Sequence, residues 1–493
     1  SVDTLNASGD GGDFTVTGTV AISDGNLDIN TKGGNINITG AISSAGTDET
    51  LTLDDGTGTG TITLGSSATS GSITLIGDSG ITLTGNLVST DTAGGAIALT
   101  GPVTLAGDIT VDADANNTSV TFNSTATVNS DSTGTKRDLT INTGAGAVAM
   151  QGIIGGSVAL DAISINAATA GAGTVEVANI AGAAGAVSIG NGATATLTLD
   201  GTTYTSTGAQ TYEANDINIT AGADVTFTTT NTAVEFQDGA AGQIVLSDAT
   251  DLTITTSGGN ITIAPTIAGT DSGGGGNTAE DITLNAAGGT VTLSNTGAAV
   301  LATEIGDVTL TGATIALSNS ITSTGTNSAG NAATIDINGA VTLNDNDITF
   351  TTGGAGIDFS STIVSGSTTP RALTIAQGAG AVVINGNIGG TANNDVGNIT
   401  IGATGNNGNI TLSGDIGTDS VAGAAVVALG NASTGLITLG GAEYNTSGTQ
   451  TYTADDYNLN GTAITLTTSN DIVTFNDGGG DGSIDLADAA ALT

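Results

Sequence analysis

Aspartates are the side chains of this sequence that are best suited to hold a ligand. Two pairs have the spacing that places both carboxylates on one face of a β-strand, and a third group occupies the glycine-rich stretch DGGGDGSID. Calcium takes roughly six to eight oxygen ligands, which such residues supply in part. The candidate calcium ligands are Asp112, Asp114, Asp345, Asp347, Asp477, Asp481 and Asp485. The alternative is that they are solvated turn residues, because neither a calcium-binding nonapeptide repeat in register nor an EF-hand loop is present.

Catalytic chemistry has few residues to work with. The chain has no histidine and no cysteine, which excludes a Ser-His-Asp triad, a cysteine nucleophile and an ordinary zinc site. A polysaccharide-cleaving site needs clustered acids, a basic residue and aromatic platforms, yet the chain has only 4 basic residues and 2% aromatic residues. We therefore expect no enzyme, and no cofactor other than the calcium considered above.

Basic residues recur at one position of a repeated segment. Lys136 and Arg137 open a segment whose second copy opens with Arg371. The guanidinium group is a planar fork of donors that matches carboxylate and carbonyl oxygens. We expect these arginines to be structural forks to a neighbouring oxygen, not catalytic groups.

Tyrosines mark a second repeated segment, and they are the candidate interface residues. Residues 201–212 read GTTYTSTGAQTY, and residues 441–452 read GAEYNTSGTQTY. Tyrosine is enriched at interfaces, so a lateral contact or a glycan platform is one interpretation. A locally wider coil packed by aromatic rings is the other. The four residues are Tyr204, Tyr212, Tyr444 and Tyr452.

The chain is an internal duplication, and a long internal period is the signature of a repeat architecture. Residues 33–38 (GGNINI) match residues 258–263 (GGNITI), and offsets between copies drift from about 225 to about 240 positions. We divide the chain into residues 1–253 and 254–493, two successive copies without a linker. The last two residues match Leu252 and Thr253, from which we expect continuation head to tail.

Short bursts of alternating β-branched and polar residues, separated by Gly, Asn or Asp, predict strands of about 4 to 6 residues. A string of immunoglobulin-like sandwiches is one all-β solution, but such cores contain bulky aromatics. The chain has 7 Phe, 3 Pro and 79 Gly. A thin core of Val, Ile, Leu and Ala favours a parallel β-solenoid of roughly 20 coils, each of about 20 to 25 residues.

Residues 206–227 (STGAQTYEANDINITAGADVTF) and residues 447–466 resemble a phrase common in large bacterial surface proteins. With the GGNITI-like strands around it, the chain is similar to the β-strand-repeat shafts of filamentous-haemagglutinin-like exoproteins and adhesins. The resemblance implies a right-handed parallel β-helix on the bacterial cell surface that spaces or displays other domains. It implies no catalytic residues, because these shafts have none.

The charge of the chain excludes one class of partner. A net charge of −42 repels phosphates, so nucleic acid is not expected to bind. No apolar run approaches the roughly 20 residues that span a bilayer. The expected function is that of an extracellular fibre or adhesin shaft, whose partner is a further copy, head to tail and also side by side. The alternative is an adhesin that binds carbohydrate or a host surface through its loops.

Overall fold

A computed structural model describes most of the chain. The described residues are 2–3, 11–23, 25–44, 46, 48–69, 71–90, 95–168, 171–239, 242–247, 250–270, 280–294, 305–327, 330–390, 395–402, 405, 408–417, 423–479 and 482–486. They form two compact units, and each is described by itself. The first unit comprises residues 1–221 and 225–243, and the second comprises residues 222–224 and 244–493.

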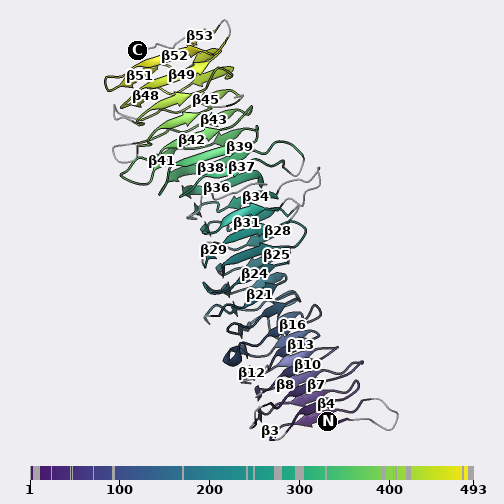
Figure 1. The fold of residues 1–493 in the computed structure, drawn as a ribbon. Coiled ribbons are helices and arrows are strands. Elements are labelled where there is room, and N and C mark those ends of the chain that lie inside the picture. The colour runs from purple at the N-terminus through teal and green to yellow at the C-terminus, as the bar shows by residue number, and fades with distance from the viewer. Residues whose placement is uncertain are drawn as a thin grey trace. The chain divides into compact units, whose positions relative to one another are not determined.

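The first unit is a stack of coils, and each regular coil contributes one strand to each of three parallel sheets (Figure 1). The first sheet contains β1 (Val2–Asp3), β4 (Leu27–Asn30), β7 (Leu51–Asp54), β10 (Ile73–Ile76), β13 (Ile97–Thr100), β16 (Val120–Phe122), β19 (Val148–Met150), β21 (Thr174–Val177), β24 (Thr196–Leu199) and β27 (Asp216–Ile219). The second contains β2 (Phe14–Val16), β5 (Ile36–Ile38), β8 (Ile62–Leu64), β11 (Ile81–Leu83), β14 (Val103–Leu105), β17 (Val128–Ser130), β22 (Ile180–Ala183), β25 (Thr203–Ser206) and β28 (Val225–Thr228). The third contains β3 (Val20–Ile22), β6 (Ile42–Ser44), β9 (Ser67–Thr69), β12 (Leu87–Ser89), β15 (Ile109–Asp112), β18 (Leu139–Asn142), β20 (Ile163–Ile165), β23 (Val187–Gly190), β26 (Gln210–Ala214) and β29 (Val234–Asp238).

The second unit repeats this plan. Strands β30 (Gln243–Leu246) and β33 (Thr266–Gly269) pair with each other, and one seven-stranded sheet contains β37 (Ile321–Ser323), β39 (Ile348–Thr352), β42 (Leu373–Ala376), β44 (Ile399–Ile401), β46 (Val427–Leu429), β49 (Gln450–Ala454) and β52 (Val473–Asp477). A further ladder joins β31 (Leu252–Thr255), β34 (Glu280–Asn285), β36 (Ile305–Leu317), β38 (Ile335–Leu343), β40 (Ile357–Phe359), β43 (Val382–Ile384), β45 (Ile410–Leu412), β47 (Leu436–Leu439), β50 (Asp456–Leu459) and β53 (Ser483–Leu486). The remaining strands are β32 (Ile261–Ile263), β35 (Thr290–Leu293), β41 (Ile363–Ser365), β48 (Glu443–Thr446) and β51 (Thr465–Thr468). The long strands β36 and β38 pair with two ladders each, because they bend at a register shift near Thr311.

The core consists of inward columns in which like residues lie on like. Ile73 of β10 pairs with Ile97 of β13, and Thr74 pairs with Ala98 on the outward side. Alternate residues of these strands are buried because successive side chains point to opposite faces of a strand. The alternating pattern of the sequence therefore becomes a thin aliphatic core with a polar outer surface.

Buried threonines close many of the corners between strands. The Thr31 hydroxyl donates to the Gly34 carbonyl at 2.5 Å, and Thr143 makes the same contact with Gly146 at 2.8 Å. The chain reverses sharply between these partners: Gly33 has a φ of 104°, a left-handed conformation that favours glycine. We call the threonines that donate to the carbonyl three residues later the corner threonines: Thr31, Thr143, Thr229, Thr256, Thr352 and Thr468.

The predicted all-β parallel β-solenoid is confirmed, with about 18 turns in place of the roughly 20 that were expected. Coils are longer and more variable than the sequence indicates. Coil-to-coil hydrogen bonds span 20 residues from Thr84 to Leu64 but 30 residues from Thr290 to Asn260. The extra residues lie in the corners, where period-two alternation gives no information. Among the described residues, regular helix is confined to one 3-10 turn, Asp114–Asn116.

Candidate functional site

The first candidate metal pair does not share a strand face. Strand β15 ends at Asp112, and Asp114 opens the 3-10 turn that follows, where its N–H donates to Asp112 Oδ1 at 3.0 Å. Burial, together with the hydrogen bond to Asp112 and its charge, raises the pKa of Asp114. The prediction that both carboxylates project from one strand face is therefore wrong, because the spacing holds only while the strand continues.

The second pair is divided in a similar way. Asp345 and Asp347 both lie in the turn between β38 and β39, outside either strand. Ser318 Oγ donates to Asp345 Oδ2 at 2.8 Å, whereas the N–H of Ala372 donates to Asp347 Oδ1 at 2.8 Å. Each carboxylate thus fixes a different neighbouring coil, and the shared strand face predicted for them is wrong as well.

The glycine-rich group lies in the last described turn. Asp477 ends β52 and accepts the N–H of Gly479, Asp485 is exposed on β53, and Asp481 lies outside the described residues. Within the described part of the chain, no group of three or more Asp, Glu, His or Cys residues is arranged to hold a metal ion. Calcium binding remains a prediction.

Aspartate has a visible structural role between coils. Asp251 Oδ1 accepts the N–H of Asp281 at 2.9 Å, and Asp281 Oδ1 accepts the N–H of Asp307 at 2.6 Å. Each carboxylate therefore ties the start of the next strand to its own coil. Burial raises the pKa of Asp251, as do the charges of the neighbouring aspartates, while the Asp281 N–H opposes the shift. In this column, like charges recur once per coil.

The predicted fork is confirmed for Arg137, whereas Arg371 makes a single contact with a carbonyl. Arg137 donates from Nε and Nη2 to the two carboxylate oxygens of Asp131 at 2.8 and 3.2 Å. Arg371, the matching residue of the second copy, donates from Nε to the Asn344 carbonyl at 3.3 Å. One arginine thus holds a carboxylate and the other a carbonyl, and both connect chain segments near the same repeated strand.

The tyrosines of the first copy lie inside the coil. Tyr204 and Tyr212 have 0% exposure, and so do Phe227 and Phe236 on the next coil. Tyr204 stacks on Phe227 with ring centroids 4.7 Å apart, and Tyr212 stacks on Phe236 at 5.1 Å. The rings therefore pack the interior of a wide coil, as the alternative interpretation of these tyrosines predicts, and they do not form a surface interface.

A buried glutamine explains why the tyrosines recur with one spacing. Gln210 Nε2 donates to the Tyr204 carbonyl and, across to the next coil, to the Thr228 carbonyl, both at 3.0 Å. Its Oε1 accepts the Tyr212 hydroxyl at 3.1 Å. We call Tyr204, Gln210 and Tyr212 the first tyrosine–glutamine clamp. It satisfies a buried phenol and two buried carbonyls that would otherwise lack partners.

The second copy contains the same clamp, formed by Tyr444, Gln450 and Tyr452. Gln450 Nε2 donates to the Tyr444 carbonyl at 2.7 Å and to the Thr467 carbonyl at 2.9 Å, and the Tyr452 hydroxyl donates to Gln450 Oε1 at 2.9 Å. Tyr444 and Tyr452 are also at 0% exposure. Sequence reasoning singled out the tyrosines but missed the glutamine, although QTY recurs in both copies. That recurrence was the available signal.

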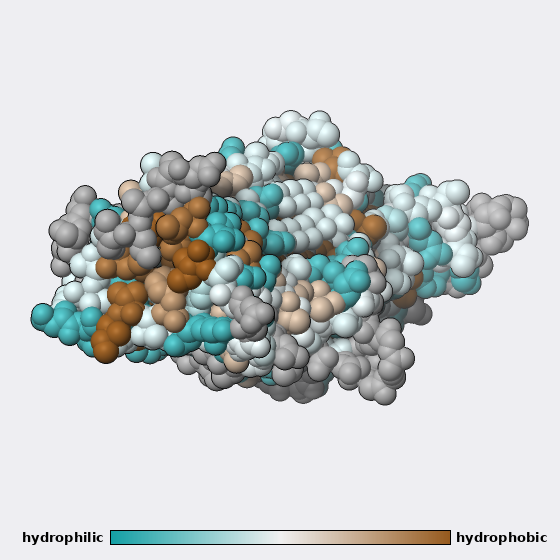
Figure 2. All heavy atoms as spheres, turned by 90° about the horizontal axis from the view of Figure 1, so that it is seen from above, coloured by the Kyte–Doolittle hydropathy of each residue, from teal (hydrophilic) through white to brown (hydrophobic). Residues whose placement is uncertain are grey.

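The last described turn has the sequence of an interior turn but an exposed surface. Ile484 and Leu486 of β53 are 48% and 51% exposed, whereas the matching Ile244 and Leu246 of β30 are at 0%. Strand β30 has β33 beside it, while β53 pairs with β50 alone among the described strands. Figure 2, which views the molecule from above Figure 1, shows hydrophobic side chains gathered on this end of the second unit.

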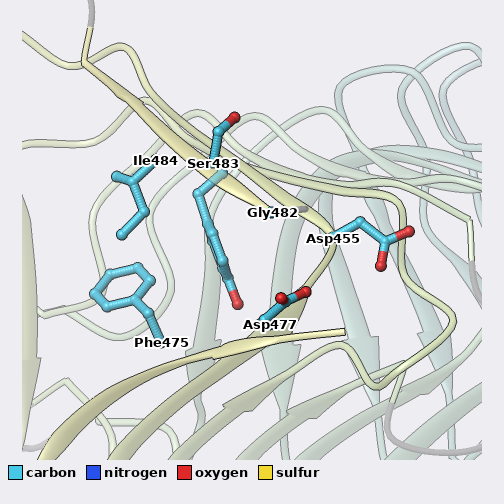
Figure 3. A pocket seen from close by; sticks show the side chains of 7 residues that line it. Asp455, Phe475, Asp477, Gly482, Ser483 and Ile484 are labelled. Carbon is cyan, nitrogen blue, oxygen red and sulfur yellow. The ribbon is translucent and has the colours of Figure 1, made fainter. Parts of the chain in front are cut away.

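A small hollow of about 150 Å³ opens on the same turn. Figure 3 shows Phe475 and Ile484 on one side of it and the carboxylates of Asp455 and Asp477 on the other. Tyr457 also lines the hollow, and its hydroxyl donates to the Tyr452 carbonyl at 2.9 Å. The hollow is therefore part of the packing between the last described turns.

Relationships to known proteins do not extend these observations. No described helix is long and apolar enough to cross a membrane. The similarity to filamentous-haemagglutinin-like shafts rests on the repeated phrase and the GGNITI-like strands around it. No protein-family model, no curated protein and no solved structure matches the chain.

Proposed function

We propose that this protein is an extracellular structural β-solenoid, the shaft of a surface adhesin or the protomer of a fibre, that grows by head-to-tail addition of further coils. It has no catalytic role in this proposal. Stiffness comes from continuous ladders of backbone hydrogen bonds, and repeats of this kind bury their hydrophobic faces by stacking on a neighbour.

The observation that carries the proposal is the contrast between β30 and β53. The same two apolar positions are covered in one copy and half exposed in the other. Covering an apolar side chain of this size stabilises by roughly 1.5 to 3 kcal/mol relative to leaving it exposed. An unpaired strand edge also offers a row of N–H and C=O groups to another strand. Both features favour a further coil on this face, and the acidic outer surface opposes side-by-side clumping.

The test is electron microscopy and light scattering of the purified chain. We expect linear multimers whose length rises with protein concentration, because an axial contact that does not close can repeat. The double variant Ile484→Asp with Leu486→Asp places two charges on the contact and should leave single, short particles. Ile153→Asp is the matched control, since Ile153 is 41% exposed but lies in the first unit, far along the sequence from β53. This control should assemble as the unmodified chain does.

Single particles of the unmodified chain at all concentrations would contradict axial growth. Multimers that persist in the double variant would place the contact elsewhere. The carbohydrate-binding adhesin draws no support from the tyrosines that suggested it, because their rings are buried. Binding of the chain to a glycan array would revive that alternative.

A further inference from the structure

One corner of the first unit carries a carboxyl group where other corners carry a hydroxyl. Asn30 of β4 pairs with Asp54 of β7, so the next residues, Thr31 and Asp55, occupy the same corner of successive coils. The Thr31 hydroxyl contacts the Asp55 carbonyl at 3.4 Å, and the N–H of Gly33 donates to that same carbonyl. Asp55 therefore stands in the same column as one corner threonine, Thr31, and Gly77 follows it on the next coil.

The side chain of Asp55 is buried and only half satisfied. It is at 0% exposure. Its Oδ1 accepts the N–H of Asp78 from the next coil at 3.2 Å, but its Oδ2 has no hydrogen-bond partner. An ionised carboxylate can only accept hydrogen bonds, so it cannot donate to a turn carbonyl as a corner threonine does. A protonated carboxyl group can.

One equivalent corner of the second unit has an uncharged side chain at the position of Asp55. In the second unit, the Thr352 hydroxyl contacts the Gln377 carbonyl at 3.1 Å, which repeats the relationship of Thr31 to Asp55. Gln377 is also at 0% exposure, and its side chain is a neutral amide. The corner threonines are neutral as well. A charge at this position costs far more than a neutral polar group, because burial removes its hydration.

We propose that Asp55 is a proton-controlled corner of the solenoid: it is closed when Oδ2 carries a proton that it donates to a carbonyl of the turn at residues 56–60, and it loosens when the carboxyl group ionises. The atoms balance without a co-reactant, since the proton comes from water and returns to it. Acidification would then stiffen this part of the stack, and neutral pH would loosen it.

The two neighbouring carboxylates favour the protonated form of Asp55. Asp54 precedes it on β7, and Asp78 faces it from the coil of β10; both carry negative charge. Lys32 is the cation of the corner on the other side, where its backbone packs against Gly56. Burial is the largest influence and raises the pKa of Asp55 to about 6, while the Asp78 N–H opposes the shift.

The sign of the effect follows from this pKa. Between about pH 4 and about pH 6 the folded corner binds more protons than the unfolded chain, so its contribution to stability falls as pH rises through that window. Above it, the ionised carboxylate leaves the corner without its donor. The corner is thus a device that responds to mild acidification.

Hydrogen exchange of the full chain, followed by mass spectrometry on peptides that cover residues 50–64, tests the proposal at pH 5 and pH 7.5. After correction for intrinsic exchange rates, we expect the protection of this segment to fall roughly tenfold more in the unmodified chain than in Asp55→Thr. Asp55→Thr copies the corner threonines and should stay protected at both pH values. Asp55→Asn, which is neutral and nearly isosteric, should behave in the same way.

Asp28→Asn is the control for general relief of negative charge, because Asp28 lies on β4 outside the corner. It should keep the pH dependence of the unmodified chain. The proposal is overturned if the unmodified chain and both Asp55 variants lose protection equally between the two pH values. It is also overturned if both variants are less protected than the unmodified chain at pH 7.5.

Discussion

The hydroxyl of Tyr212 donates to the side-chain oxygen of Gln210 at 3.1 Å, inside a coil from which water is excluded. The same contact recurs between Tyr452 and Gln450 at 2.9 Å, although the surrounding residues differ. In the first copy Phe227 pairs with Tyr204 and stacks on it, whereas in the second copy Leu466 occupies the equivalent position and pairs with Tyr444. The polar clamp is thus kept in full, whereas of the two aromatic stacks only that of Tyr212 on Phe236 recurs, between Tyr452 and Phe475.

We predict that Gln210→Ala lowers the free energy of unfolding by about 2 to 4 kcal/mol. The change leaves a cavity, and it leaves the Tyr212 hydroxyl and the Tyr204 and Thr228 carbonyls without their buried partner. Urea unfolding followed by circular dichroism measures the effect. Gln151→Ala is the matched control, because Gln151 is exposed, and it should change stability by less than about 0.5 kcal/mol. Equal effects of the two changes would contradict the clamp.

Glycines that touch the next coil should resist substitution more than glycines that do not. Gly101 has a φ of 104°, and a Cβ there would lie 1.9 Å from the Gly77 carbonyl oxygen. We expect Gly101→Ala to cost at least about 2 kcal/mol, through backbone strain and the forced separation of two coils. At Gly107 the nearest atom to a Cβ would be 3.8 Å away, so Gly107→Ala should be close to neutral. Thermal unfolding of the two variants measures this difference. Similar melting temperatures would show that neighbouring coils can separate at Gly101 at little cost.

The fold was predictable because its information is local and repetitive. Alternation such as Ile73-Thr74-Leu75 specifies a strand with one buried face, and stacking needs only that each coil repeat it. The arginine contacts were predictable for a related reason, since Arg137 and Arg371 keep one place in a repeated segment. In both cases the residue that makes the structural contact recurs at the same place in the repeat.

The predicted placement of the aspartate pairs on one strand face is wrong because it depends on a corner. Asp112 and Asp114 have strand spacing, but the strand ends between them, and no alternation marks that end. Asp55 was not noticed, because its corner is longer than that of Thr31 and the loop lengths hide the column. Gln210 was passed over because glutamine is usually exposed. Burial of a polar residue at a corner or in a wide coil becomes visible only when the coils are stacked.

Calcium should act on this protein as a screening ion. We expect millimolar Ca²⁺ to raise the melting temperature no more than Mg²⁺ at equal ionic strength, because Asp112 accepts the N–H of Asp114, and Asp345 and Asp347 accept from two different neighbouring coils. Differential scanning fluorimetry with both ions provides the comparison. A rise specific to calcium, lost in Asp112→Asn with Asp114→Asn, would restore the calcium hypothesis for that pair.

The column of Asp251, Asp281 and Asp307 should make the second unit less stable as pH rises from acid toward neutral. Burial and neighbouring charge raise the pKa of Asp251, so the folded chain holds this proton more tightly than the unfolded chain does. The stability that protonation contributes is therefore present at low pH and is lost as pH rises through the folded pKa.

Asp251→Asn keeps the oxygen that accepts the Asp281 N–H but removes the charge. We expect this variant to unfold at a higher urea concentration than the unmodified chain at pH 7, and at a similar concentration at pH 3.5. Added salt should reduce the difference in unfolding urea concentration between the variant and the unmodified chain at pH 7, because salt screens the exposed part of the repulsion between the aspartates. If the two chains differ as much in unfolding urea concentration at pH 3.5 as at pH 7, the charge of the Asp251 carboxylate is not the cause of the difference.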